Sequence, residues 1–101
     1  MLVIAGTIDV DQTKWNEAIS VVTEMMRATR SETGCEAYTF SADLEDPGRF
    51  HLFERWASPD ALAAHLEAPH MATFQAAAAR LGVRATEIVR YEVSSSGPVR
   101  A

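Results

Sequence analysis

Cysteine is almost absent from this chain of 101 residues, because Cys35 is its single example. One thiol forms no intramolecular disulfide and no cysteine-based metal cluster, so the fold must rest on a hydrophobic core. Basic side chains are also few and scattered: 9 Lys and Arg stand against 14 Asp and Glu, for a formal net charge of -5. We therefore expect no nucleic-acid-binding surface.

Long apolar runs are missing as well, and none approaches the roughly 20 residues that span a bilayer. The opening residues 1–8 lack the basic leader and cleavage pattern of a signal peptide. We expect a cytoplasmic protein without membrane contact. The glycines stand alone, which leaves no phosphate-binding loop for a nucleotide cofactor; they are Gly6, Gly34, Gly48, Gly82 and Gly97.

What is present is the composition of an ordinary globular protein, with 48% hydrophobic and 23% charged residues. The length predicts one compact domain, which we place at residues 1–93. Residues 94–101 begin with three serines, a glycine and a proline, and we expect them to form a flexible C-terminal tail.

Hydrophobic periodicity predicts four strands and two helices. Thr13 is the expected N-cap of the first helix, and Ser58 followed by Pro59 begins the second. Pro69 should break that second helix, because a proline disfavours the helical conformation of the residue before it. The predicted strands are Leu2–Val10, Cys35–Asp43 with Glu36, Tyr38 and Phe40 on one face, Arg49–Ala57 and Val83–Val93.

The element order β-α-β-β-α-β indicates an α+β fold of the ferredoxin-like type, with both helices on one face of an antiparallel sheet. The first and third strands nevertheless carry apolar residues on both faces, such as Ile4 against Val3 and Leu52 against Phe53. A second apolar face needs its own cover, so we expect a homodimer.

One acid, one tryptophan and two histidines are concentrated between the third strand and the broken helix. Glu54 and Trp56 share the inward strand face, and His51 points the opposite way. His65 belongs to the inward stripe of its helix with Leu62 and Leu66. Histidine titrates near neutral pH, so His65 or His70 is a candidate general base, with Glu54 as the group that orients it.

Each of these residues also has a structural interpretation. Glu54 could simply pair with His65, His70 or Arg90, and Trp56 and His65 could be core residues. His70 could do no more than begin a helix. The two histidines are five residues apart across a proline, which is not the i, i+4 spacing of a helical metal site, so we expect no metal.

Three strings carry a family resemblance: residues 32–38 (ETGCEAY), residues 53–56 (FERW), and residues 65–71 (HLEAPHM) followed by Phe74. Together they resemble the antibiotic biosynthesis monooxygenase family, especially its quinol monooxygenase-like members. The resemblance covers residues 2–93 and implies a dimeric α/β barrel that oxidises a quinol or hydroxylated polycyclic aromatic with O2, without metal or flavin. The implied site is catalytic His65, His70 and Glu54, with Trp56 and Phe74 against the aromatic substrate.

Related branches keep other interpretations open. Haem-degrading relatives ligate haem through a helical histidine, and the corresponding position here is Gln75, so no haem is expected. An isomerase of a small dicarbonyl compound could use the same histidines, with a phosphate anchor drawn from Arg49, Arg55, Arg80, Arg84 or Arg90. A non-catalytic dimer that binds an aromatic metabolite is the third possibility.

Overall fold

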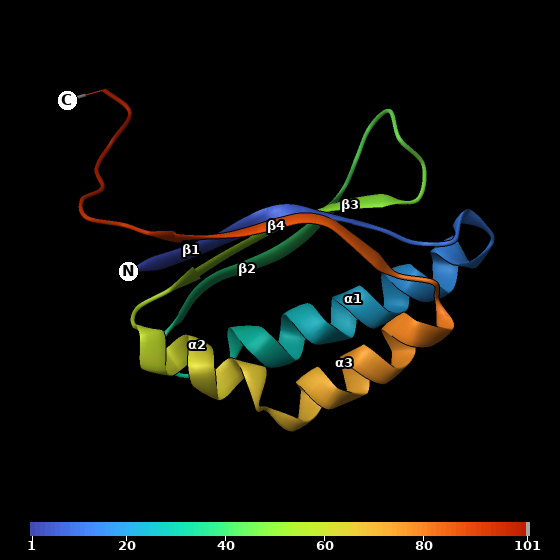
Figure 1. The fold of residues 1–101 in the computed structure, drawn as a ribbon, viewed down its shortest axis with the longest axis horizontal. Helices are drawn as coiled ribbons and strands as arrows, with labels where there is room; N and C mark the ends of the chain where they lie inside the picture. The colour runs from blue at the N-terminus through green and yellow to red at the C-terminus, as the bar shows by residue number, and fades with distance from the viewer. Residues whose placement is uncertain (101) are drawn as a thin grey trace.

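The computed structural model describes residues 1–100 as two layers, an antiparallel sheet of four strands and three α-helices packed on one of its faces (Figure 1). The strand order is β2-β3-β1-β4. This arrangement confirms the predicted ferredoxin-like α+β fold. The elements are β1 (Leu2–Asp9), the 3-10 helix η1 (Gln12–Lys14), α1 (Trp15–Arg30), β2 (Cys35–Ala42), β3 (Arg49–Trp56), α2 (Pro59–Leu66), α3 (Pro69–Arg80) and β4 (Arg84–Glu92).

The helix boundaries follow the sequence signals with one correction. Ser58 caps α2 as predicted, because its hydroxyl accepts the N–H of Ala61 at 3.2 Å. Pro69 begins α3 after a short break. Thr13 is not the N-cap of the first helix: Asp11 accepts the backbone N–H of Thr13 at 2.9 Å, and a turn of 3-10 helix precedes α1. The Asp11 carboxylate caps this 3-10 turn and also accepts the Thr13 hydroxyl at 2.7 Å, whereas α1 itself begins after Lys14 without a side-chain cap.

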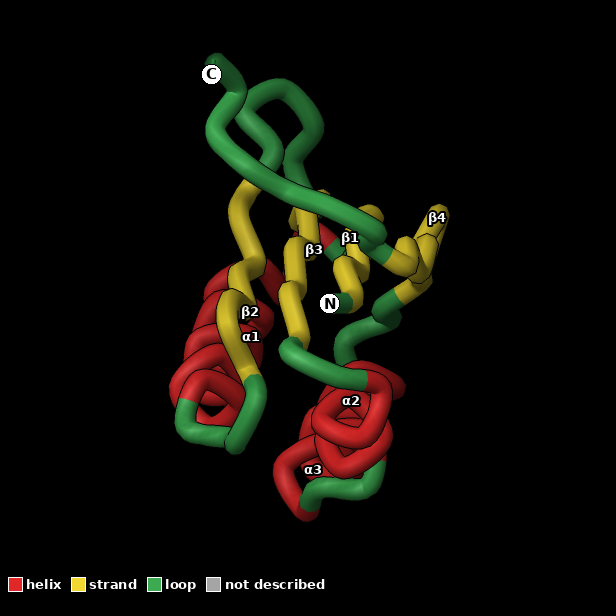
Figure 2. The backbone as a smooth tube through the Cα atoms, turned by 90° about the vertical axis from the view of Figure 1, so that its left-hand side faces the viewer, coloured by secondary structure: helices red, strands yellow, loops and turns green. Residues whose placement is uncertain are grey.

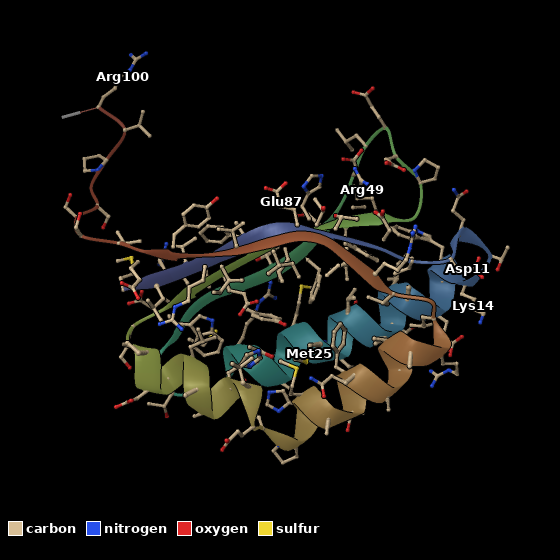
Figure 3. The ribbon with its side chains drawn as sticks, viewed as in Figure 1. Asp11, Lys14, Met25, Arg49, Glu87 and Arg100 are labelled. Atoms are coloured by element: carbon tan, nitrogen blue, oxygen red, sulfur yellow. The ribbon has the colours of Figure 1, made fainter. Side chains whose placement is uncertain are left out.

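The hydrophobic core fills the space between the sheet and the helices (Figure 3). Strand β3 alternates as predicted, with its inward residues buried. Two side chains depart from the predicted pattern. Leu66, at the end of α2, is 58% exposed. Glu36 is exposed because a register shift between Cys35 and Ala37 turns it outward, where it lies 3.3 Å from Arg55.

The opposite face of the sheet has no helix over it (Figure 2). The strand register places Val3 beside Tyr91 and Ala5 beside both Phe53 and Val89 on this face. Phe53 is 42% exposed and Tyr91 51% exposed. Apolar residues thus occupy both faces, as the sequence predicted. Glu87 marks the same outer face in Figure 3.

Beyond β4, residues 94–100 belong to no helix or strand, and Ala101, the last residue of the expected tail, lies outside the described residues. None of the helices in residues 1–100 combines the length and apolar character that a membrane span requires.

Candidate active site

An apolar cavity of about 450 Å³ lies between the inner face of the sheet and the helices α2 and α3. Aromatic and aliphatic side chains form most of its wall, and a few polar groups converge on it. This composition is typical of small-molecule sites. Its lining includes Ile4, Ile8, Tyr38, Phe40, Leu52, Glu54, Leu62, His65, Met71, Phe74, Ile88 and Arg90.

Glu32 is the polar centre next to this cavity. Its Oε2 atom lies 2.7 Å from Nδ1 of His65 and 2.7 Å from Nε2 of His70. One carboxylate oxygen therefore bridges two imidazoles that come from two different helices. Distances this short are typical of hydrogen bonds in which one partner is charged.

A glycine turn brings Glu32 to this position. Helix α1 ends at Arg30, and the N–H of Glu32 still bonds the carbonyl of Thr29 at 2.9 Å. Gly34 then adopts φ +83, and a Cβ there would lie 2.5 Å from the Cβ of Ala61. The missing side chain thus lets the turn approach α2 closely, and the approach carries the Glu32 carboxylate to His65.

His65 is almost completely buried, at 1% exposure, and packs against two aromatic rings. Its ring centroid lies 4.7 Å from that of Trp56 and 5.4 Å from that of Tyr38. An ionised Glu32 accepts hydrogen bonds only, so it selects the tautomer of His65 that carries its proton on Nδ1. Nε2 has no hydrogen-bond partner among residues 1–100, which leaves its lone pair available to a molecule in the cavity.

Glu54 lies on the cavity floor and pairs with tryptophan rather than histidine. The indole N–H of Trp56 donates to Glu54 Oε1 at 2.9 Å. Burial raises the pKa of Glu54, and the hydrogen bond from Trp56 together with the nearby His65 opposes part of that rise. Burial and the charges of Glu54 and Glu32 also raise the pKa of Tyr38, so its phenol stays neutral.

The structure brings the predicted site residues together with several differences. His65, Glu54 and Phe74 line the cavity. Trp56 is completely buried and supports the wall from behind, rather than presenting its ring to a ligand. His70 lines a separate groove between α1 and α3, and is linked by hydrogen bonds to His65 through Glu32.

Sequence reasoning missed Glu32 as the partner of the histidines. The available signal was a carboxylate two residues before Gly34 in a helix-ending turn, but its contact with His65 spans 33 residues of sequence. His51 points away from the cavity as predicted, and pairs with Asp43 at 2.7 Å. Of the five arginines considered as an anion anchor, Arg90 is the one that lines the cavity within the described residues.

Comparisons with known proteins concern the family and the fold. Residues 1–77 match the family model described as antibiotic biosynthesis monooxygenase. A crystal structure from Deinococcus radiodurans, provisionally described as an antibiotic biosynthesis monooxygenase, superposes with a TM-score of 0.91 at 28% identity, covering 100% of both chains. A similarly described protein from Nitrosomonas europaea shares the fold alone, with a TM-score of 0.82 at 22% identity over 94% of this chain and 100% of that one.

Among curated proteins, the uncharacterized protein sll1783 of Synechocystis is 30% identical over 95 residues. The match covers 94% of this chain and 65% of that relative's length. The family model extends from β1 into α3 and includes Glu32, Glu54, His65 and His70. The chain belongs to the antibiotic biosynthesis monooxygenase family.

Proposed function

We propose that the protein is a cofactor-independent monooxygenase that oxidises a quinol or hydroxylated polycyclic aromatic with O2. The observation that carries this proposal is His65: its Nδ1 is held by Glu32, and its other nitrogen is unpartnered beside an apolar cavity. Family membership supports monooxygenase chemistry in general. The cavity volume of about 450 Å³ is within the range of small-molecule sites.

The chemistry requires an electron-rich anion, because O2 is a triplet and reacts slowly with a closed-shell phenol. His65 accepts the phenolic proton at Nε2, and the charge of Glu32 stabilises the resulting imidazolium. The phenolate transfers one electron to O2, and the two radicals combine to form a C–O bond. Proton return from His65 and O–O cleavage release water and leave the second oxygen on the ring.

The neighbouring residues have supporting roles in this proposal. Phe74 and Phe40, with ring centroids 5.8 Å apart, provide aromatic surface for the substrate ring. Glu54 is a second proton-exchanging group, since its raised pKa moves it toward the working range of a general acid. Trp56 holds Glu54 in place, and His70 holds Glu32 from the outer side.

The test uses 1,4-dihydroxynaphthalene in oxygen-18 gas. Enzymatic monooxygenation converts it and one O2 into 2-hydroxy-1,4-naphthoquinone and one water, with one labelled oxygen in the product. Uncatalysed autoxidation instead gives unlabelled 1,4-naphthoquinone and hydrogen peroxide, so the products separate the two routes. We expect labelled product from wild type, and about 10²-fold less from His65→Gln.

Failure to form labelled product with any hydroquinone tried would contradict the oxygenase assignment. The matched control is His51→Ala, which removes the exposed imidazole of the outer face. Equal rates in wild type and His65→Gln would leave the oxygenase reaction standing but remove His65 as its base.

A second candidate is an isomerase of a small anionic dicarbonyl compound. Arg90 supports it, because this basic residue lines the cavity and its ion-pair partner, Glu92, is as far as 3.7 Å away. Such an enzyme would exchange a substrate C–H with deuterium from D2O and consume no oxygen. Ligand binding with neither reaction would indicate an aromatic-metabolite-binding protein.

We also propose a homodimer through the outer face of the sheet. Helices cover only the inner face, and Phe53 and Tyr91 remain about half exposed on the other. A Phe53→Asp variant would place a charge in that interface. Light scattering should give twice the chain mass for wild type and a monomer for the variant, and a wild-type monomer at micromolar concentration would contradict the dimer.

A further inference from the structure

We propose that Glu32, His65 and His70 form a binding site for a divalent transition-metal ion of the zinc type, and that the ion inhibits the protein. One donor atom from each side chain lies within 4.8 Å of the other two. The donors come from the turn after α1, from α2 and from α3. An ion bound there would link three separate segments of the layer that covers the cavity.

The donor chemistry favours zinc over harder ions. Two imidazole nitrogens and one carboxylate oxygen are a common zinc set, whereas magnesium and calcium prefer oxygen ligands. Zinc binds such donors at about 2.0–2.2 Å in tetrahedral geometry, which leaves the fourth position for water. The present 2.7 Å contacts are hydrogen bonds, so the three donor atoms must rearrange locally to surround an ion at these shorter distances.

The surroundings restrict the orientation of His65 and leave His70 accessible to solvent. Trp56 and Tyr38 both pack against the ring of His65, and this contact restricts the orientation of that ligand. His70 is 26% exposed and lines the groove between α1 and α3, which provides an entry path from solvent. The spacing argument against a metal assumed a single helix. The proline break places the two histidines on different helices, and they converge on one carboxylate nevertheless.

Inhibition follows because the ion would bind the same Nδ1 atom of His65 that now contacts Glu32. An ion on Nδ1 of His65 displaces the proton that Glu32 holds there, and a neutral imidazole then carries its proton on Nε2. That nitrogen can no longer accept a proton from a ligand in the cavity. This second half of the proposal rests on the proposed function, whereas binding of the ion does not.

The experiment titrates ZnCl2 into the purified, chelator-treated full chain by calorimetry at neutral pH. We expect one ion per chain, and at least tenfold weaker binding in Glu32→Gln and in His70→Ala. Co2+ in place of Zn2+ should give the visible absorption of a tetrahedral site in wild type only. His51→Ala is the matched control, because it removes a solvent-exposed imidazole paired with one carboxylate and should leave the stoichiometry unchanged.

No binding by wild type would overturn the site, as would binding that is unchanged in both ligand variants. Circular dichroism checks that the variants fold, and His70 is exposed enough for its replacement to be tolerated. A separate measurement adds Zn2+ to the oxygen-uptake assay and removes it with a chelator. Stoichiometric binding without loss of uptake would retain the site and overturn its inhibitory role, while absence of uptake in metal-free wild type would contradict only the proposed function.

Discussion

The two carboxylates near the cavity, Glu54 and Glu32, differ in their burial and in their hydrogen-bond partners. Glu54 is on a strand, is buried, and receives one side-chain hydrogen bond, from Trp56. Glu32 is in a turn, is partly exposed, and receives hydrogen bonds from two imidazoles. Glu32 therefore has two hydrogen-bond donors beside it, whereas Glu54 has one and lies in surroundings that favour its neutral form.

This difference shows that the acid on the inward face of the strand is not the acid that contacts the histidines. Glu54 is the acid that strand alternation places inside, and it was the natural candidate to orient a histidine. The histidines are instead held by an acid on a different element. A carboxylate that fixes a tautomer should matter most for turnover, whereas a buried carboxylate with a raised pKa should matter most for the pH dependence of stability.

The largest expected effect separates the two acids by activity. Glu32→Gln keeps the shape of the side chain but removes the charge that orients His65 and stabilises its protonated form. We predict a loss of about 10²-fold in kcat/KM for labelled product formation, against less than about tenfold for Glu54→Gln. Steady-state kinetics on both variants measures the ratio. A larger loss in Glu54→Gln would reverse the roles assigned to the two acids.

The next effect is on stability, through the support of Glu54. Trp56→Phe removes the indole donor and leaves a buried carboxylate without its hydrogen bond. We predict a loss of about 1–3 kcal/mol in the free energy of unfolding, measured by urea denaturation. The double variant Trp56→Phe with Glu54→Gln should be more stable than the sum of the two single effects predicts, because a neutral amide without the indole donor is easier to bury than a carboxylate. Strict additivity would mean that the two side chains are energetically independent.

Most of the fold could be predicted from sequence because its signals are local. Alternation in residues 49–56, the Ser58 and Pro59 start, and the Pro69 break each act within a few residues, and the structure has all three. The errors in the elements are local as well. Thr13 is not the cap of α1 because a 3-10 turn capped by Asp11 comes before that helix, and the strand register of Glu36 changed at a bulge that alternation cannot reveal.

The candidate site was predicted less completely because its central contact is not local. Periodicity predicts that His65 faces inward, but not which acid it meets. That contact depends on how α1 ends and on the close approach of Gly34 to α2, and both are tertiary features. Trp56 was placed correctly on the inward face, yet burial behind Glu54 and His65 depends on packing that a single strand does not specify.

A smaller effect concerns the pH dependence that Glu54 adds to stability. Its folded pKa is raised above the ordinary 4.5, so the folded chain binds more protons than the unfolded chain once the pH rises above that value. Stability is therefore lost as pH rises from about 4.5 through the folded pKa, and Glu54→Gln lacks this loss. We predict a melting temperature for Glu54→Gln a few degrees above wild type at pH 7, with the gap narrowing below pH 4.5. Thermal melts across this range measure the gap, and one that widens toward acid would contradict the direction of the shift.

The smallest effect is expected at the exposed pair on the outer face, which tests whether the cavity alone carries the chemistry. His51 and two backbone N–H groups hold the pKa of Asp43 at about 2, below its ordinary 3.8. The stability that this carboxylate adds is present above pH 3.8 and is lost as the pH falls toward 2. His51→Ala should raise the pKa of Asp43 only part of the way, because both N–H groups remain. An NMR titration of the Asp43 carboxyl carbon measures that pKa.

At pH 7 we expect a melting temperature for His51→Ala within about 2 degrees of wild type, because exposed ion pairs contribute little. Product formation should stay within about twofold of wild type, and a loss as large as that of Glu32→Gln would move the reacting group from the cavity to the outer face.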